Sequence, residues 1–348
     1  MNITVKCRFC GERIALNEDT HERRLSQTDP HQQLRRHLLK LKAPFPWFGG
    51  KSRVAPIVWE RFGDVTNYVE PFAGSLAVLL GRPTTPKTET VNDLDCYLAN
   101  FWRATSIDPE GVAEFTDWPV NEADLHARHL WLVKRDEFRE RMKTDPEFYD
   151  PRVAGWWVWG LCQWIGSGWC NSGQGINRMI HAGHVKRPML SGNGHGVGVH
   201  ADRGNYLLDY FEALRDRLRR VRVCCGDWRR VTGPSVTEKH GASGIFLDPP
   251  YDMRVVLSKD AGRDGAAQSD AIYAHHDNKL AADVRAWAIE NGDNPLLRIA
   301  LCGYEDEHAA HMPDTWDCFY WEAHERIWFS PYCLKPQKTF QFEEVLAL

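Results

Sequence analysis

The fold is decided by the stretch from residue 67 to residue 93, NYVEPFAGSLAVLLGRPTTPKTETVND. It opens with a strand-like run at 67–70, which enters a turn of proline and small residues. Residues 75–80 have the composition of a helix, and residues 88–91 form a second strand-like run before an Asn-Asp pair. This order of strand, turn, helix and strand is typical of a βαβ unit. We therefore expect an α/β domain with a parallel sheet.

The same alternation returns late in the chain, after a stretch that interrupts it. Residues 105–205 are rich in Trp, Gly and His, and we expect an inserted region of helices and loops there. Apolar residues at helical spacing then predict a helix at 205–219. The further elements that we expect are strands at 221–225, 244–247 and 296–302, a helix capped by Asp277 and ended by Gly292, and a terminal hairpin of 327–329 with 339–342.

These patterns divide the chain into four segments. Residues 1–43 form a separate small module, which ends at the run APFP, where prolines disfavour helix. One α/β domain is built from residues 44–104 and 206–348, and residues 105–205 are inserted between its two parts.

Composition places the chain among soluble proteins. Its 348 residues are 43% apolar and 26% charged, as in ordinary globular domains. The opening residues MNITVKCRFCGER are too polar for a signal peptide, and the longest apolar run, 153–165, is too short to span a bilayer. Ten Cys at irregular spacings indicate reduced thiols and not a disulfide framework. We expect a cytoplasmic protein with no membrane partner.

Positive charge is concentrated in two blocks of a chain whose net charge is −4. Residues 21–53 hold eight Lys/Arg and two Asp/Glu, a local net charge of +6. Residues 151–232 hold twelve Lys/Arg and five Asp/Glu, a local net charge of +7. Such blocks could form a one-sided footprint for the phosphates of a nucleic acid. The alternative is that both are solvated helix faces.

Asp248-Pro249-Pro250-Tyr251 is the sharpest chemical motif, and it follows the expected strand 244–247. Ligands of open α/β sheets bind at the carboxyl ends of strands. The Asp248 carboxylate and the Pro249 carbonyl can each accept one N–H from an amino group. The prolines stiffen the turn and add no competing donor, and Tyr251 offers a flat face for stacking a base. The alternative is a proline-rich turn with a capping aspartate.

Two further segments have the composition of a nucleotide-like cofactor site. The turn EPFAG at 70–74 contains small residues, which let the backbone approach a ligand closely. Asp93 lies about twenty residues later, at the end of the next strand, where an acidic residue typically accepts hydrogen bonds from ribose hydroxyls. In WFGGK at 47–51, the glycines permit an unusual backbone path and the lysine could pair with a carboxylate. The alternative for that segment is a loop with an exposed lysine.

In this order, the segments WFGGK, EPFAG, NDLD (92–95) and DPPY resemble the Dam-type (D12 class, alpha-group) DNA adenine-N6 methyltransferases. The similarity covers roughly residues 44–104 and 220–303. It implies a class I methyltransferase fold, a Rossmann-like and mostly parallel sheet of seven strands that binds S-adenosylmethionine. By the match, Asp93 binds the ribose and Asp227 meets the adenine of this cofactor. The cofactor-binding residues that the resemblance implies are Trp47, Gly49, Gly50, Lys51, Glu70, Pro71, Phe72, Ala73, Gly74, Asp93, Asp227 and Asp248, and the catalytic residues are Asp248, Pro249, Pro250 and Tyr251.

The resemblance implies site-specific methylation of adenine N6 on a base that is rotated out of double-stranded DNA. Residues 105–205 would then carry target recognition, and a cognate restriction nuclease is a candidate partner. Two alternatives stay open. The same motifs serve methyltransferases that act on cytosine N4 or on RNA amino groups. The other alternative is a non-catalytic DNA-binding protein with a methyltransferase fold.

The N-terminal module contains a set of zinc-ligand residue types. Cys7 and Cys10 flank a knuckle-like turn, and His31 and His37 follow. Zinc is typically held by four such ligands in a tetrahedron, so zinc is a second candidate cofactor. The alternative is two free thiols on a polar terminus.

Five tryptophans cluster in the inserted region, at positions 156, 157, 159, 164 and 169. Stacking on an extruded base is one interpretation. We favour the other, in which they form the core of a small helical subdomain.

Overall fold

The computed structural model describes residues 3–6, 13–16, 41–47, 50–145, 147–164, 169–170, 196–202, 205–250, 279–321 and 324–336. The chain divides into two compact units, Met1–Lys40 and Leu41–Leu348. In the first unit, β1 (Ile3–Lys6) and β2 (Arg13–Leu16) form a two-stranded antiparallel sheet with Ile3 opposite Leu16.

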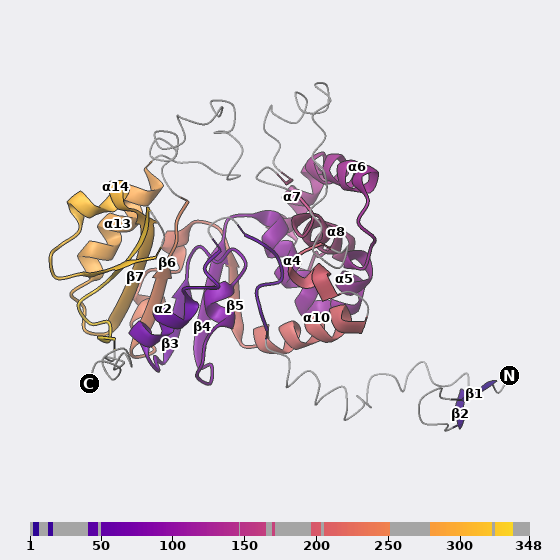
Figure 1. The fold of residues 1–348 in the computed structure, drawn as a ribbon, viewed down its shortest axis with the longest axis horizontal. Helices are drawn as coiled ribbons and strands as arrows, with labels where there is room; N and C mark the ends of the chain where they lie inside the picture. Colours follow the sequence, from indigo (N-terminus) through magenta and orange to yellow (C-terminus); the bar gives the residue numbers. More distant parts are fainter. Residues whose placement is uncertain are drawn as a thin grey trace, which may run out of the picture. The chain divides into compact units, whose positions relative to one another are not determined.

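The second unit is built around a seven-stranded sheet in the order β5-β4-β3-β6-β7-β9-β8 (Figure 1). The strands from β5 to β7 are mutually parallel, and β9 runs antiparallel to both β7 and β8. This confirms the predicted α/β fold with a mostly parallel sheet of seven strands. The strands are β3 (Asn67–Glu70), β4 (Thr88–Asp93), β5 (Val221–Cys225), β6 (Ser243–Leu247), β7 (Leu297–Tyr304), β8 (Asp317–Tyr320) and β9 (Glu325–Phe329).

Helices α4 to α8 and α10 gather beside the β5 edge of the sheet, whereas α13 and α14 lie near β7 (Figure 1). The helices of the described residues are α2 (Ala55–Phe62), α3 (Ala77–Leu80), α4 (Cys96–Ile107), α5 (Pro109–Thr116), α6 (Glu122–Val133), α7 (Asp136–Thr144), α8 (Pro151–Leu161), α10 (Asn205–Leu218), α11 (Pro234–Thr237), α13 (Leu280–Asn291) and α14 (Glu305–His308). Three short 3-10 turns accompany them, η3 (Gly198–Asp202), η4 (Trp228–Arg230) and η6 (Ala309–His311).

The two faces of the sheet bury separate hydrophobic cores. Successive side chains of a strand point to opposite faces, so Tyr68 joins the core beneath α2 and α4 whereas Val69 joins the core beneath α13. In β6, Phe246 packs in the first core and Ile245 in the second. All four residues of β3 are therefore buried, which is typical of a central strand covered by helices on both faces.

Local sequence patterns located most strands of the seven-stranded sheet. The predicted strands at 67–70 and 221–225 are confirmed at both ends. The helix predicted at 75–80 starts later, at Ala77, because Leu76 adopts a left-handed backbone conformation with φ 58° that a helix cannot include.

Two predictions near the C-terminus involve residues outside the described ranges. Helix α13 has Lys279 at its N-cap, and the Lys279 side chain makes no cap hydrogen bond; Asp277, the predicted cap, lies outside the described residues. Gly292 does end the helix, as predicted. The strand predicted at 327–329 is β9, and its described antiparallel partners are β7 and β8. The predicted partner at 339–342 lies outside the described residues.

The tryptophan-rich region is a packed helical core. Trp157 and Trp159 on α8 are almost fully buried, which confirms the core interpretation for these two residues. Trp157 packs edge-on against Phe45 at a ring-centroid distance of 5.0 Å. Among the residues that the structure describes, no helix combines the length and apolarity that crossing a membrane requires.

Candidate active site

The candidate site lies at the edge of the sheet where its parallel strands end. Since β3, β4, β5 and β6 all run in the same direction, Glu70, Asp93 and Asp248 come to one edge. Residues separated by up to 178 positions thus lie at the same edge of the sheet.

The turn after β3 is held against the end of β4. The backbone N–H of Gly74 donates to the Asp93 carboxylate at 3.0 Å, and that of Ala73 donates to the Asn92 carbonyl at 2.9 Å. Gly74 has φ +45°, and a Cβ there would lie 2.6 Å from the Trp47 indole. Only glycine fits this position, and Trp47 lies directly against the turn.

Asn92 ties three strand ends together, a role that the sequence did not indicate. Its buried side-chain amide donates to the Pro71 carbonyl at 3.0 Å and to the Gly226 carbonyl at 2.9 Å. These bonds join the turns after β3 and β5 to the end of β4. An asparagine at the end of a predicted central strand, directly before the acidic Asp93, is the signal that could have identified it.

Asp93 is a partly buried carboxylate with a perturbed pKa. It accepts hydrogen bonds from the backbone N–H groups of Gly74 and Asp95, at 3.0 and 3.1 Å. Burial raises its pKa to about 6, although these hydrogen bonds oppose the rise. Asp93 therefore ionises close to neutral pH and has acceptor capacity for ribose hydroxyls.

Lys51 brings two carboxylates together. Its ammonium lies 3.1 Å from Asp248 Oδ2 and 3.7 Å from Glu325 Oε2, and its side chain is only 4% exposed. Burial by itself would lower the pKa of Lys51, but the negative charges of Asp248 and Glu325 outweigh it and the pKa is raised. The predicted pairing of Lys51 with a carboxylate is thereby confirmed, and the interpretation as an exposed lysine is wrong.

Glu70 is fully buried behind this pair. Its Oε2 atom has no hydrogen-bond partner among the described residues. Burial raises its pKa well above the usual range, and the nearby charge of Asp248 raises it further. Burial therefore favours the protonated, neutral form of Glu70.

Asp227 lies at the surface beyond the end of β5. Its side chain is 55% exposed, caps the η4 turn through the Arg229 backbone N–H, and pairs with the Arg229 guanidinium at 3.3 Å. Trp228 beneath it is buried and packs against Phe72 at a ring-centroid distance of 6.1 Å. An aromatic contact thus connects this turn to the EPFAG turn.

Several predicted site residues lie outside the described residues. They are Gly49, Tyr251 and the four predicted zinc ligands Cys7, Cys10, His31 and His37. Within the described ranges, no cluster of three or more His, Cys, Asp or Glu side chains could hold a metal ion.

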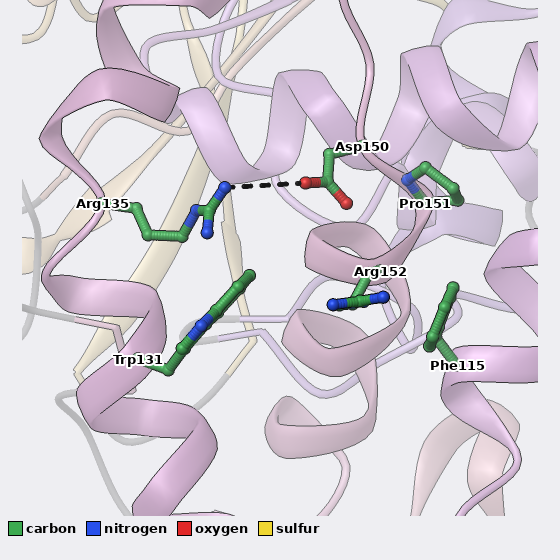
Figure 2. Close-up of a pocket in the computed structure, with 6 residues that line it drawn as sticks. All are labelled: Phe115, Trp131, Arg135, Asp150, Pro151 and Arg152. Carbon is green, nitrogen blue, oxygen red and sulfur yellow. Dashed lines mark ion pairs between the residues drawn. The ribbon is translucent and has the colours of Figure 1, made fainter.

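Two pockets lie away from the Asp248 and Asp93 carboxylates. One, of about 290 Å³, is in the helical region, and Figure 2 shows the long Arg135–Asp150 ion pair, 4.0 Å, at its rim. Its lining residues are Phe115, Trp131, Arg135, Asp150, Pro151 and Arg152. The other, of about 420 Å³, lies between Trp228 and α13. Neither contains a residue that the sequence predicted as part of the site.

Residues 47–158 match the family model described as D12 class N6 adenine-specific DNA methyltransferase. The chain carries a D12 class DNA adenine methyltransferase domain. The resemblance seen in the sequence is thereby confirmed, and the protein is an enzyme of this class. No curated protein matches the chain.

The family match includes some of the residues at the edge of the sheet and not others. The match spans Trp47, the EPFAG turn, Asp93 and the helices up to most of α8, so it includes about half of the inserted region. It ends before Asp227 and Asp248. The contact between Lys51, inside the match, and Asp248, outside it, connects the two parts of this methyltransferase.

Proposed function

We propose that this methyltransferase takes its methyl group from S-adenosylmethionine and delivers it to N6 of an adenine rotated out of double-stranded DNA. One observation carries the proposal. Asp248 follows β6 directly and lies 3.1 Å from a buried ammonium, on the sheet edge that also bears the Gly74 turn and Asp93.

The residues of this edge fit S-adenosylmethionine. Gly74 presents backbone without a Cβ, and Asp93 presents a carboxylate suited to two ribose hydroxyls. Asp227 would accept from the adenine amino group of the cofactor, in place of its present Arg229 contact. When bound, the cofactor supplies an electrophilic methyl group on a sulfonium centre.

Asp248 and Pro249 would position the target amino group. An exocyclic amino nitrogen is a weak nucleophile because its lone pair is delocalised into the ring. With one N–H bonded to the Asp248 carboxylate and the other to the Pro249 carbonyl, the nitrogen becomes more tetrahedral and its lone pair points outward. Catalysis is then mainly positioning, with no covalent bond to the enzyme.

Lys51 would fix the orientation of the Asp248 carboxylate. Its ammonium contacts Oδ2, which fixes the rotation of the carboxylate that would accept the target N–H. Rotation of the base out of the duplex is required because N6 cannot reach a donor inside the base stack.

The function is tested with methyl-labelled S-adenosylmethionine and duplex DNA, followed by mass analysis of the released nucleosides. We expect label in N6-methyladenine. Label in N4-methylcytosine, or in RNA alone, would favour the rival amino-methyltransferases. DNA binding with no transfer would favour the non-catalytic alternative.

Two substitutions test the role of Asp248. Asp248→Asn keeps the shape of the side chain, and we expect it to slow transfer by at least about 100-fold while the cofactor still binds. Asp248→Ala should do the same, but it leaves the buried Lys51 ammonium without this partner, so its thermal unfolding must be compared with the parent. Near-normal turnover by Asp248→Asn would refute the assignment.

Other expectations stay predictions at this point. They include target recognition by residues 105–205, a cognate restriction nuclease, a cytoplasmic location, and zinc at Cys7, Cys10, His31 and His37. Elemental analysis of the purified protein tests the last of these, and less than about one-tenth of an equivalent of zinc would end it.

A further inference from the structure

We infer that Glu325, a residue outside every recognised motif, is a positioning residue for methyl transfer that acts through Lys51. The inference rests on the proposed function of Asp248. It concerns the second carboxylate beside the Lys51 ammonium: Glu325 Oε2 lies 3.7 Å from the nitrogen that also contacts Asp248, so two carboxylates share its positive charge.

Sheet topology explains how Glu325 reaches the site. Glu325 is the first residue of β9 and pairs with Tyr304, the last residue of β7. Because β9 runs antiparallel to β7, it begins at the edge where β6 and β7 end. An antiparallel strand thus brings an acidic residue to the edge that binds ligands in parallel sheets.

The Glu325 side chain is fixed in place. The Trp321 indole N–H donates to Glu325 Oε2 at 2.8 Å, the same oxygen that approaches Lys51. The Arg326 guanidinium donates to the Glu325 backbone carbonyl at 2.9 Å. The carboxylate is only 17% exposed, so solvent screens its charge weakly. The indole hydrogen bond holds the side chain and the Arg326 contact holds its backbone, so the carboxylate has little freedom to leave Lys51.

The chemical consequence is that two carboxylates attract the Lys51 ammonium, Asp248 at 3.1 Å and Glu325 at 3.7 Å. An ammonium has three N–H donors, and this one is almost completely shielded from water. With Glu325 neutral, the ammonium would turn toward both oxygens of Asp248, including the oxygen needed by the target amino group. Glu325 opposes this because its carboxylate also attracts the ammonium.

Glu325 also sets the net charge around the reacting nitrogen. Asp248, Lys51 and Glu325 together carry one negative charge. The amino nitrogen gains positive charge as its bond to the methyl carbon forms. A fixed negative charge nearby stabilises that change in a site that excludes water.

The test is the single-turnover rate of methyl transfer by Glu325→Gln, which keeps an acceptor for Trp321 and removes the charge. We expect a loss on the order of 10- to 100-fold, with dissociation constants for cofactor and duplex DNA within about threefold of the parent. Glu325→Asp should recover part of the rate. Glu305→Gln is the matched control, since Glu305 lies at the same edge but pairs with Arg326 at 2.6 Å, and it should stay within about twofold of the parent rate.

A Lys51→Met background distinguishes positioning from a purely structural role. If Glu325 acts through Lys51, adding Glu325→Gln to Lys51→Met costs no more than about twofold. Two results would overturn the inference. One is a single-turnover rate of Glu325→Gln within about twofold of the parent rate. The other is that Glu325→Gln lowers the rate as much in the Lys51→Met background as it does in the parent. Failure of the parent enzyme to transfer any methyl group would instead refute the proposed function, before any variant is compared.

Discussion

Replacing Glu89 by Gln should destabilise the whole methyltransferase domain. Glu89 is on β4, its side chain is fully buried, and it accepts hydrogen bonds from two arginines. Arg217 of α10 contacts its two oxygens at 2.6 and 2.9 Å, and Arg82 contacts it at 3.2 Å. The cluster fixes the end of α10 to β4, and so fixes where β5 begins.

The expected magnitude follows from the burial of the three charges. The side chains of Arg82 and Arg217 are 1% and 16% exposed, so solvent cannot replace the lost carboxylate. The Gln amide would also direct N–H donors at a guanidinium. Removing one partner of such a buried pair costs about 3–5 kcal/mol, a large part of the roughly 5–15 kcal/mol that stabilises a typical domain.

Urea unfolding, followed by far-ultraviolet circular dichroism and by tryptophan fluorescence, measures this loss. The matched control is Asp64→Asn, which breaks an exposed ion pair with Lys87 and should leave the unfolding midpoint unchanged. A loss below about 1 kcal/mol for Glu89→Gln would show that the buried cluster does not stabilise the fold.

Three further outcomes follow from the shifted pKa values. Cofactor affinity should weaken as pH falls through about 6, the pKa of Asp93, because protonation removes an acceptor for the ribose. Calorimetric titration at several pH values measures this affinity, and Asp93→Asn should abolish its pH dependence. The free energy of unfolding of Glu70→Gln should rise relative to that of the parent as pH increases above 4.5. The reason is that Glu70 ionises in the unfolded chain above this pH, whereas burial raises its pKa in the folded protein. An equal difference between the two proteins at about pH 5 and about pH 8 would contradict this. A hydrogen bond from Cys225 lowers the pKa of Cys96 to about 7, so its alkylation by iodoacetamide should be half-maximal near that pH, and Cys225→Ala should move the midpoint upward.

Local patterns predicted the strands well because the strands are short apolar runs between clear turn residues. The strand at 67–70 ends at Pro71, and the strand at 221–225 ends at Gly226, so both boundaries are visible in the sequence. The start of α3 was not visible, because nothing in the sequence indicates that Leu76 adopts a positive φ. Tertiary packing, and not residue preference, places it there.

The sequence predicted the site residues that end parallel strands. It did not predict Glu325, which an antiparallel strand brings to the site. Asp93 and Asp248 end strands that run in the same direction, so their shared edge follows from a βαβ pattern. Glu325 begins a strand, and its place depends on β9 pairing with β7. The sequence suggested a different hairpin partner, so the Lys51–Glu325 contact could not be inferred.

One tryptophan of the inserted region contacts the segment around Trp47. Trp157 of α8 packs against Phe45 and Trp47, at ring-centroid distances of 5.0 and 6.0 Å. Trp47 in turn occupies the space beside Gly74 that a Cβ would need. The helical region therefore forms the support behind the turn that the cofactor would approach, and it is not an appendage of the sheet. A shift of α8 on DNA binding would reach that turn through two aromatic contacts, which gives the two parts of the enzyme a direct physical connection.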